Sequence, residues 1–403
     1  MLTRRSFLQT SAVSTAYVIS GVRASFAANA PGITDTEIKI GQTMPYSGPA
    51  SAYAVVGRVE AAYFKMINEA GGVNGRKIKL ISVDDGFSPP KAIEQIRRLV
   101  EQEGVAFIFG SLGDPTNLAV RQYLNDNKIP QIFVAALAES VADPEHYPWT
   151  IPLNSAASNE THVTARYIAT TKPNAKIAIL YQNDPVSRIF LKAIREGLGS
   201  AAESMIVKEL SFEVSDPTVD SQVISLAASG ADTFMIGAGP KGTAQAISKA
   251  YDLGWRPDRF IGSNSSSVAG VMKPAGLEKS KGVITAGYGK DPNDPRWRDD
   301  PAVREWAAFA AKHLSAADSN DVFPFYGYSV STLMVHVLKQ CGDDLSRENV
   351  MRQALSVKDF VAPILLPGIT INTSPTNYVP IRQFQLARFN GATWENFGDV
   401  ISD

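Results

Sequence analysis

The glycine-rich run Gly237-Ala238-Gly239-Pro240-Lys241-Gly242 is the first candidate for chemistry. It has the G-x-G-x-x-G spacing of a dinucleotide-binding turn and lies between a predicted strand (233–236) and a predicted helix (244–253). However, Pro240 has no N–H to offer a pyrophosphate, and the next strand ends at Gly262-Ser263-Asn264 without a carboxylate for a ribose hydroxyl. We therefore interpret the run as a strand-to-helix turn, and keep an exported nucleotide-cofactor oxidoreductase as the alternative function.

Other catalytic and metal-binding patterns are missing from the sequence. There is no G-x-S-x-G around a serine, and three of the four histidines (His162, His313 and His336) fall in predicted helices. H-E-x-x-H, EF-hand and Walker-type motifs are also absent, and the single cysteine, Cys341, cannot form an intrachain disulfide. These observations predict neither a cofactor nor a metal, and they favour a binding protein over an enzyme.

Polar residues gather instead in the loops that follow predicted strands. These loops are 44–53, 84–90, 110–115, 135–139, 182–188, 237–242 and 263–267. Because ligands of open parallel sheets bind outside the carboxyl ends of the strands, we expect a ligand site there. Tyr53 and Tyr326 are among the aromatic residues in or beside loops that could bury the apolar body of a ligand.

The elements that position these loops alternate between short β-branched runs and longer helical patterns. One β/α block extends from residue 37 to 134, and a second restarts at 177 after an interval containing Pro144, Pro148 and Pro152. The pattern predicts an α/β fold with two Rossmann-like, doubly wound parallel-sheet lobes. The tail predicts a β-hairpin with a tight turn at Asn390-Gly391.

Bulk composition and the N-terminus indicate an exported, soluble protein. The chain has 403 residues, more than one hydrophobic core usually supports, and a net charge of −1, which does not suggest a nucleic-acid partner. Residues 1–28 resemble a twin-arginine export signal, with Arg4-Arg5, an apolar stretch and a cleavage site near Ala27. No later apolar stretch reaches the roughly 18–20 residues needed to span a membrane. We expect a periplasmic location.

Two stretches of the sequence carry a family resemblance. The first is Ile38-Lys39-Ile40-Gly41 followed by Pro45-Tyr46-Ser47-Gly48-Pro49, and the second is Ile67-Asn68-Glu69-Ala70-Gly71-Gly72-Val73-Asn74-Gly75-Arg76-Lys77-Ile78. Both resemble the leucine/isoleucine/valine-binding proteins. These are periplasmic solute-binding components of ABC importers with the type I periplasmic-binding-protein fold. The resemblance implies two lobes joined by a three-strand hinge, with lobe 1 at 29–152 plus 281–366 and lobe 2 at 153–280 plus 367–403.

The same resemblance implies a function and a site. The protein would capture a small carboxylate by hinge closure, as a monomer, and deliver it to a membrane permease, although a sensory role on the same fold stays open. Backbone N–H groups of two first-lobe loops would hold the ligand carboxylate. The implied ligand-binding residues are Ser47, Tyr53, Ser111, Leu112, Gly113, Ala135, Ala136, Leu137, Asp184, Val186, Gly237, Ala238, Asn264 and Tyr326.

Asn264 is a departure from the family pattern, because amino-acid binders place an acid there to meet the ligand ammonium. A buried ammonium without a carboxylate partner costs several kcal/mol. The sequence therefore favours an aromatic acid over a zwitterionic amino acid. Asp114, Glu139 or Asp184 could still supply the charge.

Overall fold

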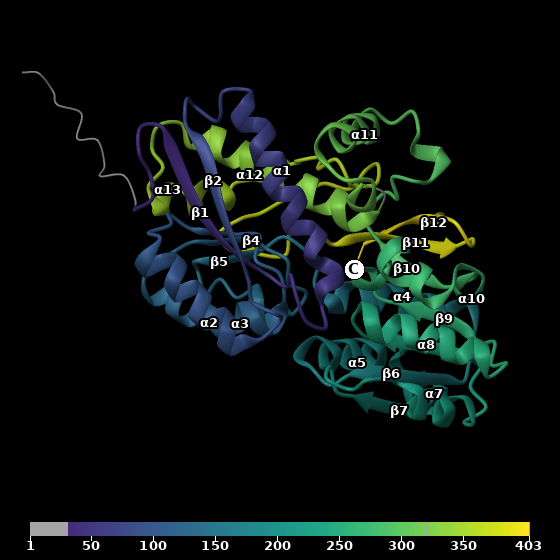
Figure 1. Ribbon diagram of the computed structural model, residues 1–403. Coiled ribbons are helices and arrows are strands. Elements are labelled where there is room, and N and C mark those ends of the chain that lie inside the picture. Colours follow the sequence, from purple (N-terminus) through teal and green to yellow (C-terminus); the bar gives the residue numbers. More distant parts are fainter. Residues whose placement is uncertain (1–30, 320, 403) are drawn as a thin grey trace, which may run out of the picture.

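The computed structural model describes residues 31–319 and 321–402. The predicted export signal, residues 1–28 with cleavage near Ala27, lies outside these ranges. Figure 1 shows two lobes, each built from a sheet with helices on both faces. No helix within the described residues is long and apolar enough to cross a bilayer.

The first lobe contains a five-stranded, all-parallel sheet with strand order β2-β1-β3-β4-β5. The non-sequential position of β1 between β2 and β3 is that of a doubly wound sheet. The strands are β1 (Glu37–Met44), β2 (Lys77–Asp84), β3 (Ile108–Phe109), β4 (Gln131–Val134) and β5 (Thr150–Pro152).

Helices cover both faces of this sheet (Figure 1). One face packs into the large core formed with α1 (Ala54–Glu69), α11 (Pro301–His313), α12 (Val322–Cys341) and α13 (Arg347–Ala354). The other face packs against α2 (Pro89–Arg97) and α3 (Asp114–Asp126). Burial of both faces explains why β4 is largely apolar, whereas β1 is mostly buried but also carries the polar residues Gln42 and Thr43.

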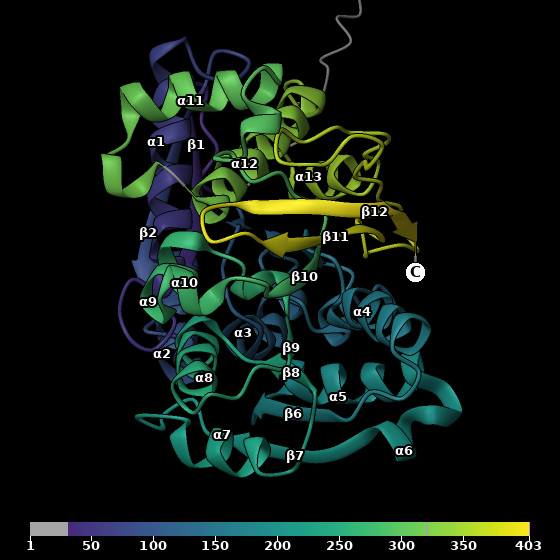
Figure 2. The same cartoon turned by 90° about the vertical axis from the view of Figure 1, so that its right-hand side faces the viewer.

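The second lobe contains a seven-stranded mixed sheet with order β12-β11-β10-β9-β8-β6-β7. Five strands are parallel, and the last two form the antiparallel C-terminal hairpin, which lies along β10 (Figure 2). The strands are β6 (Ile177–Gln182), β7 (Ile206–Phe212), β8 (Thr233–Gly237), β9 (Asp258–Ile261), β10 (Ile284–Gly287), β11 (Gln383–Phe389) and β12 (Trp394–Ser402).

Two helical layers enclose the second sheet as well. One core contains α4 (Ala157–Thr171), α5 (Pro185–Leu198) and α6 (Ala202–Met205). The core on the opposite face contains α7 (Asp220–Ala227), α8 (Pro240–Asp252) and α9 (Lys273–Ala275), and α10 (Leu277–Ser280) contacts α8 and α9. The predicted fold class, two α/β lobes with parallel sheets, is confirmed.

The chain passes between the lobes three times, and the last two passages do not lie where we predicted them. Strand β10 falls within 281–366, which we assigned to lobe 1, but it pairs with β9 and β11 in the second lobe. Ile371 and Tyr378 fall within 367–403, which we assigned to lobe 2, but they pack in the core of the first lobe. Hydrophobic pattern locates strands, whereas it does not reveal which of two similar sheets a strand joins.

Two local predictions also need correction. The C-terminal hairpin forms, but Phe389 pairs with Trp394, so the connection has four residues and is not a two-residue Asn-Gly turn. The Asn390 side chain stabilises this loop by accepting hydrogen bonds from the N–H groups of Ala392 and Thr393. Helix α4 was not predicted, because its threonine-rich sequence has weak helix propensity.

Helices α1 and α12 pack closely, and their N-terminal ends lie at the junction of the lobes (Figure 1). A Cβ built on Gly327 of α12 would lie 2.8 Å from the backbone oxygen of Val56 in α1. The glycine therefore permits a backbone approach that a side chain would prevent. This packing places Tyr53 and Phe323 together, with ring centroids 5.0 Å apart.

Candidate ligand-binding cleft

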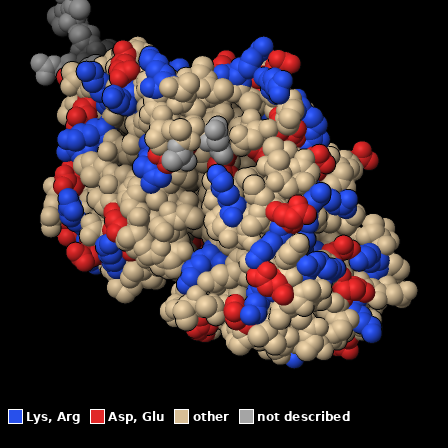
Figure 3. All heavy atoms as spheres, turned by 45° about the vertical axis from the view of Figure 1, so that its right-hand side comes forward, with Lys and Arg blue, Asp and Glu red and all other residues tan. Residues whose placement is uncertain are grey.

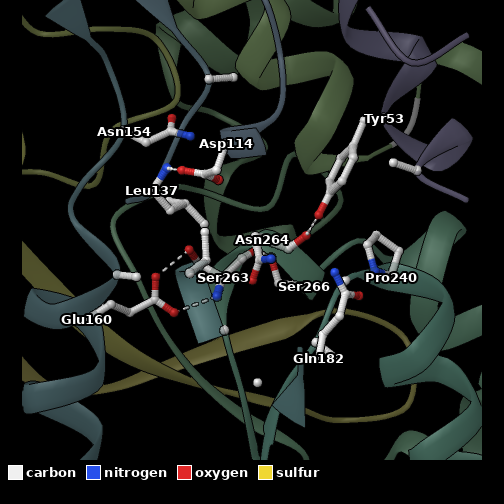
Figure 4. Close-up of a pocket in the computed structure, with 18 of the residues that line it drawn as sticks. Tyr53, Asp114, Leu137, Asn154, Glu160, Gln182, Pro240, Ser263, Asn264 and Ser266 are labelled. Carbon is white, nitrogen blue, oxygen red and sulfur yellow. Dashed lines mark hydrogen bonds between the residues drawn. The ribbon is translucent and has the colours of Figure 1, made fainter. Parts of the chain in front are cut away.

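A cavity of about 240 Å³ lies between the two lobes, and we call it the cleft. Its walls come from the carboxyl ends of the parallel strands in both sheets, and Figure 4 shows part of this lining. Residues from every strand-to-helix loop on that side contribute, as expected for open α/β sheets. The lining is largely apolar and aromatic, including Val56, Leu112, Phe190, Phe212 and Phe323.

Tyr53 connects the two sides of the cleft. It immediately precedes α1 in the first lobe, and its hydroxyl donates a 2.9 Å hydrogen bond to the backbone carbonyl of Asn264 in the second lobe (Figure 4). Burial raises the pKa of the Tyr53 hydroxyl above its ordinary range, so the group stays neutral and donates.

Asp114, the first residue of α3, lies in the first-lobe wall and is 8% exposed. Its Oδ1 accepts hydrogen bonds from the backbone N–H groups of Leu137 (2.8 Å) and Ala138 (2.6 Å). Burial raises the pKa of the Asp114 carboxyl to about 6, and these two bonds partly oppose that increase. Figure 4 shows the carboxylate directed at Leu137 N.

Glu160 occupies the second-lobe wall and comes from α4. Its two oxygens accept from the N–H and the hydroxyl of Ser263, at 2.5 and 2.6 Å (Figure 4). Burial raises the pKa of the Glu160 carboxyl to about 7, with the Ser263 bonds acting in the opposite direction. The pair ties α4 to the loop after β9, which also carries Asn264.

Hydroxyl groups line the base of the cleft near the crossover segments. The Tyr326 hydroxyl and Thr285 Oγ1 are buried and have no hydrogen-bond partner among the described residues. Tyr288 donates a long, 3.4 Å hydrogen bond to Asn154 Oδ1. A buried polar atom without a partner costs about 1–3 kcal/mol, so these positions suit contacts with a bound molecule.

The glycine-rich turn serves packing in this structure. A Cβ on Gly237 would lie 2.4 Å from the Phe190 ring, and one on Gly242 would lie 2.6 Å from the Phe212 ring. Helix α8 starts at Pro240, at the same turn. The glycines thus allow two aromatic rings to approach the turn. Across residues 31–319 and 321–402, no cluster of three or more acidic, histidine or cysteine side chains could hold a metal ion.

The sequence matches the model of the periplasmic binding proteins over residues 37–393. The chain belongs to the periplasmic binding protein family. This result confirms the resemblance noted in the sequence, and it gives no support to the oxidoreductase alternative.

Individual relatives agree with this assignment. The binding protein is 26% identical over 281 residues to "Leu/Ile/Val-binding protein homolog 7" of Brucella melitensis, covering 67% of this chain and 68% of that one. A branched chain amino acid ABC transporter structure from Thermus thermophilus with bound valine is similar in fold, with a TM-score of 0.81 at 16% identity over 92% and 98% of the two chains. A solute binding protein from R. palustris in complex with benzoate has a similar fold, with a TM-score of 0.76 at 20% identity. The match covers 91% of this chain and 98% of that one.

Most of the predicted site residues line the cleft of this binding protein. They are Tyr53, Leu112, Gly113, Ala135, Leu137, Asp184, Val186, Gly237, Ala238, Asn264 and Tyr326. Ser47, Ser111 and Ala136 do not line it. Ser47 donates to Asp84, and the Ser111 hydroxyl accepts from the N–H of Thr43 inside the lobe. Ala136 packs in a small core with Val141.

Sequence reasoning missed several polar residues of the lining, chiefly Asn154, Glu160, Gln182, Ser263 and Thr285. Glu160 lies on the helix that was not predicted, and Thr285 lies on β10, which was expected in the other lobe. The strand-end rule could have identified Gln182 and Ser263, because both fall in loops where the sequence predicts a ligand site.

Proposed function

We propose that this chain captures one small solute with an apolar body in the cleft, closes its lobes around it, and delivers it to the permease of an ABC importer. The observation that carries the proposal is the apolar cavity walled by both lobes and bridged by the Tyr53–Asn264 hydrogen bond. Contacts made to both lobes at once favour the closed state, which is how a ligand drives hinge closure.

Amino acids and aromatic acids are the two candidate ligand classes that the sequence leaves open. The valine and benzoate complexes of similar folds are consistent with both. A thermal-shift panel of leucine, valine, phenylalanine and benzoate tests them. A ligand present at about 100 times its Kd should stabilise the protein by about 2.7 kcal/mol. The proposal would be contradicted if no member of the panel stabilised the protein and no small molecule were found in the purified protein.

We also propose that the protein is exported after cleavage near Ala27, acts as a monomer, and leaves its ligand chemically unchanged. The charged side chains on the face in Figure 3 are mixed in sign, with no broad basic tract of the kind that binds nucleic-acid phosphates. The mass of the mature chain from a periplasmic extract tests export and cleavage. Light scattering in solution tests the monomeric state, and recovery of unmodified ligand tests whether the ligand stays unchanged. A cytoplasmic full-length chain, a stable dimer or an altered ligand would contradict the respective point.

A further inference from the structure

The loops after β3 and β4 were expected to offer backbone N–H groups to a ligand carboxylate, but six of these donors are already used within the first lobe. They are the N–H groups of Leu112, Gly113, Ala135, Ala136, Leu137 and Ala138. The first four donate to backbone carbonyls, whereas Leu137 and Ala138 donate to the carboxylate of Asp114. The Asp114 carboxylate, an anionic group of the protein itself, therefore occupies the last two donors of the fourth-strand loop.

Asp114 changes the polarity of this wall. Its Oδ1 accepts both backbone hydrogen bonds, and its Oδ2 accepts none from the residues that the structure describes. The residue lines the cleft, so the group that this wall presents to a ligand is an acceptor with negative charge. A buried carboxylate of this kind is stabilised by a cation or a strong hydrogen-bond donor.

The other charges of the cleft strengthen this conclusion. Besides Asp216, whose Oδ2 accepts from the N–H of Glu213, three further carboxylates line it, and both oxygens of each of these three already accept hydrogen bonds within the protein. They are Glu160 (from Ser263), Asp184 (from Ser187 and Gln182) and Asp291 (from Asn293 and Trp394). Lys241, the lysine in the lining, donates its Nζ to the backbone oxygen of Asp216 at the rim. The field in the cleft therefore disfavours a ligand with net negative charge.

An independent observation shows where an acceptor group of the ligand would bind. The Tyr326 hydroxyl and Thr285 Oγ1 line the same cleft and are donors without partners among the residues that the structure describes, and Thr285 is only 4% exposed. The cleft thus offers a charged acceptor in the first-lobe wall and neutral donors at its base. This arrangement is the reverse of one built to hold a carboxylate on the first-lobe loops.

We propose that Asp114 determines ligand specificity by binding a protonated amine of the ligand through Oδ2, while the hydroxyls of Tyr326 and Thr285 take an acceptor group. This inference rests on the proposed function and narrows it, because it favours an amine-bearing solute over an aromatic acid. Asp114 supplies from the first lobe the negative charge that Asn264 does not supply from the second.

Matched ligand pairs that differ by the amine test this inference on the unmodified protein. The pairs are phenylalanine and 3-phenylpropanoate, and leucine and 4-methylpentanoate. We expect the amine-bearing member of a pair to bind at least tenfold more tightly by titration calorimetry. Equal or tighter binding of the acids overturns the assignment of Asp114 while leaving the binding function intact. If no compound binds and no solute co-purifies, both the assignment of Asp114 and the proposed binding function are contradicted.

Substitution of Asp114 provides the second measurement. Asp114→Asn keeps an acceptor oxygen but removes the charge, and it should weaken binding of the amine-bearing ligand tenfold or more while improving binding of the matching acid. Asp126→Asn, at the exposed far end of the same helix, is the control and should leave both affinities unchanged. Unchanged relative affinities in folded Asp114→Asn overturn the proposal. If that variant does not fold, the matched pairs decide alone.

Discussion

The hydroxyl of Tyr53 and the backbone carbonyl of Asn264 are 2.9 Å apart, although the two residues belong to different lobes. The bond exists only while the lobes are together, so it contributes to the free energy of closure rather than to the stability of either lobe. Because Tyr53 also lines the cleft, the same side chain contacts the ligand site and joins its two walls.

Replacing Tyr53 by phenylalanine should therefore weaken ligand binding. The variant keeps the ring that packs on Phe323 and removes one interlobe hydrogen bond, whose net value is about 1 kcal/mol. We expect the Kd of the ligand found in the panel to rise about fivefold, as measured by calorimetry. Tyr251→Phe in α8, outside the cleft lining, is the control and should bind normally. An unchanged Kd for Tyr53→Phe would show that the bond does not contribute to closure.

Asp321 forms a second connection between the lobes. Its carboxylate caps α12 by accepting from the N–H of Val322 at 2.7 Å. It also accepts from the N–H groups of Val268 and Ala269 and from the Ser267 hydroxyl, all in the second lobe. A single buried carboxylate thus stabilises the N-terminal ends of two helical segments, one from each lobe.

We predict that Asp321→Asn shifts the protein towards an open form. An amide cannot accept from all four donors, so the interlobe hydrogen bonds weaken. The affinity for the ligand should therefore fall tenfold or more, which corresponds to about 1.4 kcal/mol of binding free energy. Asp300→Asn is the matched control, because Asp300 caps α11 through Ala302 and Val303 within one lobe. The control should lower the melting temperature without changing affinity. Equal affinities for both variants would refute the role of Asp321 in closure.

The buried carboxyl of Glu160 makes stability depend on pH in a defined direction. Its pKa rises from 4.5 to about 7, mainly through burial. Between these values the native state binds a proton that the unfolded state has lost, so stability falls as pH increases through this window. The contribution amounts to roughly 3 kcal/mol, at 1.36 kcal/mol per pKa unit.

Glu160→Gln removes this proton linkage. Between about pH 4.5 and 7.5 the free energy of unfolding of the wild type should fall relative to that of Glu160→Gln. Urea denaturation at several pH values measures both free energies. Glu145→Gln, at an exposed position, should give a difference that is flat with pH. A flat difference for Glu160→Gln as well would mean that the buried carboxyl titrates as it does in water.

Gly327→Ala reverses the usual effect of alanine in a helix. In an ordinary helix interior this change stabilises by about 0.5–1 kcal/mol. Here the new methyl would lie 2.8 Å from the Val56 oxygen, and overpacking of this kind costs roughly 1–3 kcal/mol. We expect a lower melting temperature, because α1 and α12 must separate. A higher melting temperature would show that the helices accommodate the methyl group.

Much of the fold could be predicted from the sequence, because strands such as β6 and β8 are short, continuous apolar runs between helical periods. The failures have physical reasons. Helix α4 buries Thr161 and Thr164, whose hydroxyls bond to backbone carbonyls four residues earlier, and such residues carry no apolar periodicity. The place where β10 pairs is a long-range property that the local pattern does not contain.

The site could be predicted as a set of loops but not as a pattern of donors and acceptors. Tyr53 and Asn264 were identified from strand-end position and family resemblance, and both line the cleft. The sequence does not reveal that Asp114 accepts from Leu137 and Ala138, because that contact depends on how two loops pack. The aromatic-acid preference inferred from Asn264 and the amine preference proposed from Asp114 therefore predict opposite outcomes for the matched ligand pairs.

Small-angle X-ray scattering tests most directly whether the two lobes close around one small molecule. The protein is unfolded, freed of small molecules, refolded, and titrated with the best ligand from the panel. We predict that the radius of gyration decreases with added ligand, reaches a plateau at one ligand per chain, and ends at the value calculated for the present structure, in which Tyr53 and Asn264 join the lobes. A radius of gyration that stays constant through saturation would contradict the account.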